Sequence, residues 1–164
     1  MKTISLIAAL SFVSLTLSRP SNATHSIADT SVVHVTSSKD FCLFLPPVSH
    51  TKTATDLGLD AKKATSVCRS GNTTFSPHLI SSAHYKKTKD YVQITGKLNL
   101  KGGYTGFQQF DDSLPKKSQC KGYKSFISLI DAEEGYYCLR CCNDNSCPTT
   151  EASLGCQDII PGKY

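Results

Sequence analysis

Eight cysteines that follow an apolar N-terminal segment constrain the fold of this 164-residue chain more than any other feature. Lys2, an apolar run at residues 4–17 and the small residues after it are typical of a secretory signal peptide, which we place at residues 1–18. In an oxidising compartment, cysteines form disulfides rather than metal sites. We therefore expect a secreted domain whose disulfides are drawn from Cys42, Cys68, Cys120, Cys138, Cys141, Cys142, Cys147 and Cys156.

The segments that flank this domain are polar. Residues 19–38 are rich in Ser and Thr, which predicts a flexible leader before a single cysteine-rich secreted domain at residues 39–164. Sequons at Asn22 and Asn72 predict N-glycosylation, and the first survives if the signal is cleaved after Ser18.

The apolar run at residues 4–17 is shorter than the ~20 residues that a membrane-spanning helix needs. We expect a released, extracellular protein with no membrane span.

The charge pattern limits the classes of partner. The net charge is +5, and lysines cluster at residues 86–89 and 116–124 with acidic residues nearby. This mixture favours solvated turns, with an anionic surface or polysaccharide as the alternative partner. No nucleic-acid-binding motif is present. We expect a monomer whose partner is a cell-wall polysaccharide or an extracellular protein, and not a nucleic acid.

The apolar pattern predicts a mainly β fold. One hairpin is expected from residues 79–85 and 91–100, and a second from residues 126–130 and 136–142. Apolar and polar residues alternate along residues 91–100, which predicts a half-buried strand with Gly96 at a bulge or a close backbone approach. Residues 41–45 form a short strand that ends at Pro46, and residues 60–67 suggest a helix. We predict a small disulfide-stabilised sandwich or barrel with long loops, and an α+β fold is the alternative.

The predicted strand at residues 136–142 carries adjacent cysteines. Side chains alternate between the two faces of a strand, so Cys138 and Cys142 share one face while Cys141 lies on the other. Cys141 and Cys142 are therefore expected to reach partners on opposite faces of the sheet.

Three motifs resemble a group of fungal secreted cysteine-rich glycoproteins known as macrophage-activating glycoproteins. The motifs occur in the same order, as DFCLFLPP at residues 40–47, DYVQITG at 90–96, and YCLRCC at 137–142 with the ending IPGKY. The resemblance implies a secreted fungal origin and a host response rather than a biochemical activity. The similar proteins keep the spacing of Cys138 and Cys142 without counterparts of Cys120 and Cys141, which implies that Cys120 and Cys141 pair with each other. Some of them carry a long Ser/Thr-rich, lipid-anchored tail, and we do not expect such an anchor here.

Catalytic and metal chemistry has little support in the sequence. Cys138 and Cys141 have metal-ligand and redox-motif spacing, but secretion favours disulfides. Copper held by an N-terminal His25, with His78 or His84 as a second imidazole, would need cleavage after Thr24, which breaks the small-residue preference. The acidic pairs at residues 111–112 and 133–134 lie in predicted polar turns, where they do not face each other across a cleft. We expect no catalytic residue, no metal and no cofactor, so the sequence favours a non-enzymatic protein.

The best binding candidate is the glycine-rich loop at residues 101–110. Tyr104, Phe107 and Phe110 lie there among amide side chains, and flat aromatic faces with amide hydrogen bonds suit sugar rings. The alternative is that Phe107 and Phe110 fill the β core.

Three functions follow from these observations. The first is a secreted, non-enzymatic fungal glycoprotein that acts at the cell wall or in host interaction. The second is a carbohydrate-binding module or carbohydrate-active enzyme, and the third is a small cationic effector or inhibitor of a secreted protein.

Overall fold

The structure is a computed structural model that describes residues 31–46, 62–70, 79–99, 107–111, 113, 115, 117–149 and 154–164. Most of these residues lie in short strands. The described elements are β1 (Val32–Val33), β2 (Val35–Ser37), β3 (Asp40–Leu45), β4 (Thr65–Ser70), β5 (His84–Lys87), β6 (Tyr91–Lys97), β7 (Phe107–Asp111), β8 (Gln119–Cys120), β9 (Ser125–Asp131), β10 (Tyr136–Cys142) and the short helix α2 (Cys156–Ile159). None of the described helices is long and apolar enough to cross a membrane.

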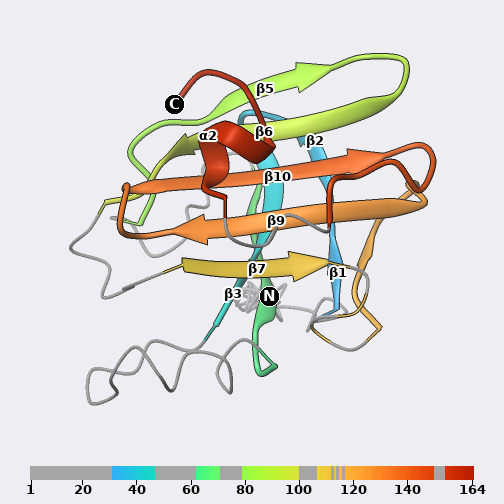
Figure 1. Cartoon of the computed structure of the whole chain (residues 1–164), viewed down its shortest axis with the longest axis horizontal. Coiled ribbons are helices and arrows are strands. Elements are labelled where there is room, and N and C mark those ends of the chain that lie inside the picture. Colours follow the sequence, from blue (N-terminus) through green and yellow to red (C-terminus); the bar gives the residue numbers. More distant parts are fainter. Residues whose placement is uncertain are drawn as a thin grey trace, which may run out of the picture.

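Two antiparallel sheets form the body of the fold. The large sheet has the strand order β5-β6-β10-β9-β7, and the small sheet has the order β2-β3-β4. The strands of the small sheet run across those of the large sheet, and α2 lies over the opposite face of the large sheet (Figure 1). A two-residue parallel pair, β1 with β8, adds to the small-sheet side. The mainly β, disulfide-stabilised prediction is confirmed, and the described sheets pack as layers.

Aromatic side chains fill the space between the two sheets. The Phe44 ring from the small sheet lies 5.5 Å from Phe126 and 6.0 Å from Phe110 of the large sheet, measured between centroids. The Phe41 ring stacks on Tyr137 at 6.0 Å. All five residues are buried, and aromatic pairs at such spacings stabilise a core beyond the area that they bury.

The C-terminal segment covers the outer face of the large sheet. Cys156, Ile159 and Ile160 pack there against apolar side chains of β9 and β10. The segment is fastened by polar contacts as well, because Gln93 Nε2 donates a hydrogen bond to the Pro161 carbonyl and Thr95 Oγ1 donates one to the Lys163 carbonyl. Gln93 and Thr95 are therefore buried, and the prediction that β6 is half-buried is wrong.

Four disulfides join the eight cysteines. The pairs are Cys42–Cys68, Cys120–Cys141, Cys138–Cys156 and Cys142–Cys147. Cys120–Cys141 is the pair implied by the family resemblance. It lies on the inner face of the large sheet and Cys142–Cys147 lies on the outer face, which confirms that the adjacent cysteines have partners on opposite faces.

Two other sequence predictions need correction. The helix expected at residues 60–67 is wrong where the structure describes it, because Thr65 begins β4 and the β-branched Thr65 and Val67 suit a strand. Part of the segment expected to be a flexible leader, residues 32–37, forms β1 and β2 instead. Val33 and Val35 are buried in the core, so their apolar side chains outweigh the polar composition around them.

Candidate functional site

The aromatic residues predicted to bind sugar are not brought together in the described structure. Phe110 is fully buried, at 0% exposure, and packs on Phe44, so its predicted ligand contact is wrong and its alternative role in the core holds. Phe107 begins β7, where only its backbone is described. Tyr104 lies outside the described residues, as do the sequons at Asn22 and Asn72.

Glu133 and Glu134 lie in a turn, as predicted, whereas the turn predicted at Asp111 is wrong because Asp111 ends β7 and pairs with Ile127. Asp111 accepts hydrogen bonds from the backbone N–H and the hydroxyl of Ser113. Glu133 and Glu134 are exposed in the turn between β9 and β10. Asp112 lies outside the described residues.

A cleft of about 690 Å³ lies between the edge strand β5 and the small sheet. Tyr85 and Lys87 reach it from β5, because alternate side chains of a strand share one face. Lys121 and Tyr123 line it from the segment that follows β8, where Gly122 adopts a left-handed φ of 82°. Tyr85 is 37% exposed, so much of its ring is open to a ligand.

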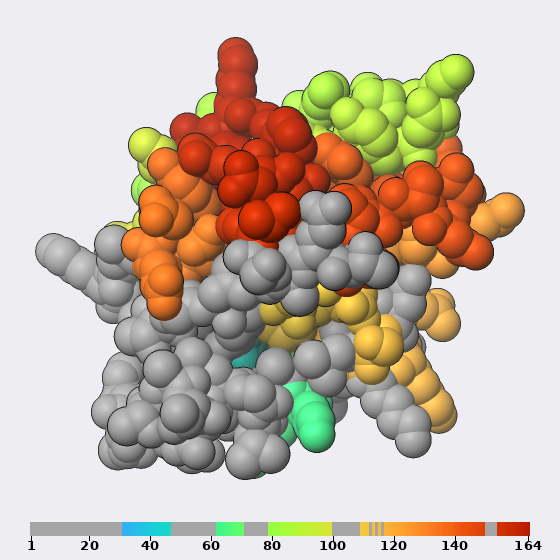
Figure 2. Space-filling model, in the orientation of Figure 1, coloured from blue at the N-terminus to red at the C-terminus, as the bar shows by residue number. Residues whose placement is uncertain are grey.

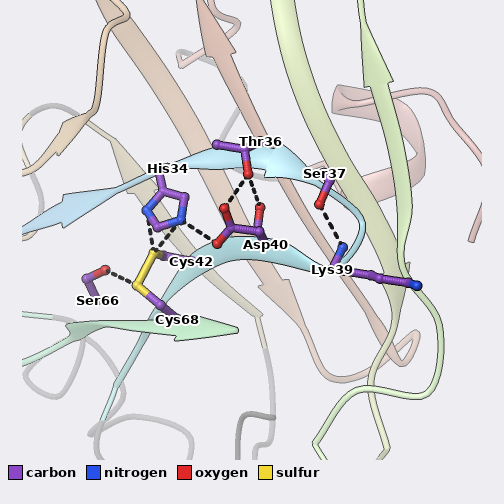
Figure 3. A network of polar contacts seen from close by, with 8 residues as sticks. All are labelled: His34, Thr36, Ser37, Lys39, Asp40, Cys42, Ser66 and Cys68. Atoms are coloured by element: carbon purple, nitrogen blue, oxygen red, sulfur yellow. Dashed lines mark hydrogen bonds and ion pairs between the residues drawn. A yellow bond between two sulfur atoms is a disulfide. The ribbon is translucent and has the colours of Figure 1, made fainter. Parts of the chain in front are cut away.

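The small sheet contributes a polar network to the same cleft (Figure 3). His34 lies between β1 and β2, and its Nε2 lies 3.0 Å from Asp40 Oδ1. Thr36 Oγ1 donates a hydrogen bond to the other carboxylate oxygen of Asp40 at 2.5 Å. The hydrogen bonds from Thr36 and His34 lower the pKa of Asp40, because they stabilise the ionised carboxylate.

The other ring nitrogen of His34 faces a disulfide. His34 Nδ1 lies 3.1 Å from Cys42 Sγ, and Cys42 is bonded to Cys68. The imidazole and the two sulfurs are close enough to share a metal ion, with donor atoms within 4.8 Å of one another. Their sulfurs are joined to each other, however, and a metal ligand needs the thiolate. The oxidised protein therefore does not offer a sulfur-rich metal site here.

A second cleft of about 690 Å³ lies on the opposite face of β5. His84 and Lys86 reach it from β5, and Lys163 borders it from the C-terminal segment. Figure 2 views this outer face, where the C-terminal segment in red lies beside the light-green hairpin that contains β5. His84 was weighed as a copper ligand, whereas His25 and His78 lie outside the described residues.

An arginine stacks on an aromatic ring beside Gln93, which lines this second cleft. The Arg140 guanidinium lies 4.4 Å from the centroid of the Tyr91 ring and donates two hydrogen bonds to Gln93 Oε1. Burial lowers the pKa of Arg140. These contacts are directed within the protein, so they fix the sheet surface rather than offer groups to a ligand.

The first cleft was not predicted from the sequence. Tyr85 and Lys87 were assigned to a hairpin and a turn, and Lys121 to a solvated cluster. The spacing of His34 and Asp40 around a polar turn at residues 37–39 could have suggested two facing strands. The tyrosine and lysine of β5 meet the polar network of His34 and Asp40 because β5 packs beside the small sheet.

Comparisons with known proteins return no relationship. No family model matches the chain, and neither the curated proteins nor the solved structures searched contain a significant match.

Proposed function

We propose that this chain is a secreted, non-enzymatic binding protein whose β5 cleft takes an extracellular polysaccharide. The cleft is defined by Tyr85, Lys87, Lys121 and Tyr123, together with the network around Asp40. The observation that carries the proposal is the pairing of two tyrosines with two lysines in one open cleft. The four disulfides support an extracellular setting.

The chemistry of the lining supports a sugar ligand. A tyrosine offers an apolar ring face and a polar tip, which is suited to the mixed surface of a pyranose ring. Lys87 and Lys121 add positive charge on the two sides of the cleft. The combination favours a polysaccharide that carries carboxylate groups over a neutral one.

The lining also supports binding without hydrolysis. Glycosidases use two carboxyl groups that flank the scissile bond. Asp40 is the one carboxylate among the residues that line this cleft, and its oxygens already accept hydrogen bonds from Thr36 and His34. The geometry is therefore that of a recognition surface. The fungal, wall-associated or host-directed role implied by the motif resemblance is the setting that we propose for it.

Binding to immobilised polysaccharides tests this function. The oxidised protein is incubated with polygalacturonate, β-glucan and chitin, and the bound fraction is measured against protein concentration. We expect saturable retention on polygalacturonate. Tyr85→Ala with Tyr123→Ala should weaken it by about thirtyfold, since aromatic contacts contribute on the order of 1 kcal/mol each. Lys87→Gln with Lys121→Gln should weaken it and reduce its salt dependence.

Matched variants distinguish binding in the cleft from non-specific attraction to the positive charge of the protein. Lys62→Gln with Lys63→Gln removes the same charge from an exposed turn and should leave retention unchanged. Equal losses in both double lysine variants would show that the attraction is non-specific. If no polysaccharide is retained, the proposal fails and an extracellular protein becomes the ligand class to test.

A further inference from the structure

We propose that Cys42–Cys68 is a reactive disulfide, which an external thiol opens by exchange with His34 acting on the departing sulfur. This reactivity is independent of polysaccharide binding. Two observations carry it: the two cysteines differ in exposure, and a histidine fixed by a carboxylate contacts the sulfur of the buried one.

The first observation concerns access to the sulfurs. Cys42 and Cys68 lie directly opposite each other on β3 and β4. Cys42 is fully buried, whereas Cys68 is partly exposed. The other six cysteines are buried, so Cys68 is the cysteine that solvent reaches most readily among the eight. An attacking thiolate therefore meets Cys68, and Cys42 becomes the leaving group.

The second observation concerns the leaving group. His34 Nδ1 lies 3.1 Å from Cys42 Sγ, and Nε2 lies 3.0 Å from Asp40 Oδ1. When the imidazole is protonated, each N–H has an acceptor, and the one on Nδ1 is directed at the sulfur that departs. Thr36 holds Asp40 in place, so the carboxylate orients the ring (Figure 3). Asp40 acts through His34 and is a positioning residue.

The exchange balances in two steps. In the first, a thiolate RS⁻ forms a bond to Cys68 Sγ, the Cys42–Cys68 bond breaks, and Cys42 Sγ takes the electron pair and the proton from His34 Nδ1. In the second, another thiolate attacks the sulfur of R in the mixed disulfide, which releases the Cys68 thiolate and RSSR. The external thiol is oxidised and the protein is reduced by two electrons. The co-reactant is a small-molecule thiol, and departure is faster when the leaving thiol is stabilised as a thiolate or protonated.

The pH dependence follows from the groups around His34. Histidine is the residue type whose charge ordinarily changes between pH 5 and 8. The other titratable side chains that line the cleft with it are Asp40, Tyr85, Lys87, Lys121 and Tyr123. The rate constant per reductant thiolate should therefore be highest while His34 is protonated and fall as pH rises.

Glutathione in limiting amounts tests the proposal on the folded, oxidised protein. The reaction is quenched with iodoacetamide at intervals between pH 5 and 8, and peptide mapping identifies each cysteine's state. We expect Cys42–Cys68 to open about tenfold faster than the other three disulfides. Glutathione should appear on Cys68, the alkylated thiol should be Cys42, and the rate per thiolate should decline with pH.

Three variants assign the roles. His34→Gln should slow opening about tenfold at low pH and flatten the profile. Asp40→Asn keeps the imidazole and should slow opening while glutathione still appears on Cys68, because the ring loses the carboxylate that orients it. His84→Gln removes a histidine from the opposite face of β5 and should match the unmodified protein.

Three results would contradict the proposed reactivity of Cys42–Cys68. Glutathione on Cys42, opening no faster than that of the other disulfides, or an unchanged profile in His34→Gln would each overturn it. Circular dichroism and the integrity of the other three disulfides establish that a variant is folded. If His34→Gln does not fold, the site of glutathionylation and the profile of the unmodified protein decide the matter.

Discussion

Gly96 is the residue at which one missing side chain matters most in the described core. A Cβ there would lie 2.1 Å from the Ser82 carbonyl oxygen and 2.7 Å from the Tyr137 hydroxyl. That hydroxyl donates a hydrogen bond to the same carbonyl at 2.8 Å, and burial raises its pKa. Gly96 therefore lets the segment before β5 approach β6 closely, which is the close approach that the sequence predicted.

We expect Gly96→Ala to lower the free energy of unfolding by roughly 3 kcal/mol, because backbone and a buried hydroxyl must move to accept the methyl group. Urea unfolding followed by circular dichroism measures the change. Gly122→Ala is the matched control, since Gly122 has a φ of +82° and no atom within 4 Å of its Cβ position. It should cost about 1 kcal/mol from the left-handed backbone alone. A loss in Gly96→Ala no larger than that in Gly122→Ala would contradict the prediction, because it would show that the backbone accepts the methyl group at little cost.

Among the elements, those with strong local patterns were predictable. The β9–β10 hairpin agrees with its prediction because a run of residues that favour strands and a polar turn ending in Gly135 act within one short segment. Gly135 adopts a left-handed φ of 74°, as such a turn requires. The strand at residues 41–45 was recognised for the same reason, since an apolar run meets a proline.

Elements that depend on distant packing were not predictable. The expected burial of β6 was wrong because its polar Gln93 and Thr95 bind the carbonyls of a segment 68 residues away. Part of the expected leader proved to be β1 and β2 because Val33 and Val35 complete a core supplied by other strands. The cleft is also long-range, since β5, the small sheet and the segment after β8 each supply part of its lining.

The C-terminal segment is the element whose attachment is simplest to test. Cys138–Cys156 closes a loop with a sequence separation of 18 residues and fixes α2 over the large sheet. Replacing both cysteines by Ser should lower the free energy of unfolding by about 3 kcal/mol and expose apolar surface to a hydrophobic dye. Removing Cys142–Cys147, with a separation of 5 residues, should cost about 2 kcal/mol without that exposure. Similar dye binding by both variants would show that the disulfide is not what holds α2 in place.

At the scale of the whole molecule, the N-terminal strands complete the core. Val33 and Val35 are buried with the inner residues of both sheets. β1 pairs with β8, and the Cys42 N–H donates a hydrogen bond to the His34 carbonyl. The folded unit therefore extends upstream of residue 39.

A chain that begins at residue 39 should be less stable than one that begins at residue 31 by roughly 3 kcal/mol or more, since two buried valines are lost. Thermal unfolding of the two oxidised proteins measures the difference. Val33→Ala with Val35→Ala in the longer chain measures how much of that difference in stability comes from the two apolar side chains. The prediction fails if the two chains unfold at the same temperature.

Cys141 and Cys142, adjacent on β10 but on opposite faces of the sheet, affect how the protein forms its disulfides during folding. A slip of one residue turns every side chain of a strand to the other face. Such a slip would carry Cys141 to the side of Cys147 and Cys142 to the side of Cys120, the reverse of the native bridges. Oxidation before the sheet has aligned would trap that misalignment in swapped disulfides. The swapped isomers recovered from oxidative refolding therefore record the strand registers that the chain sampled before it reached the native state.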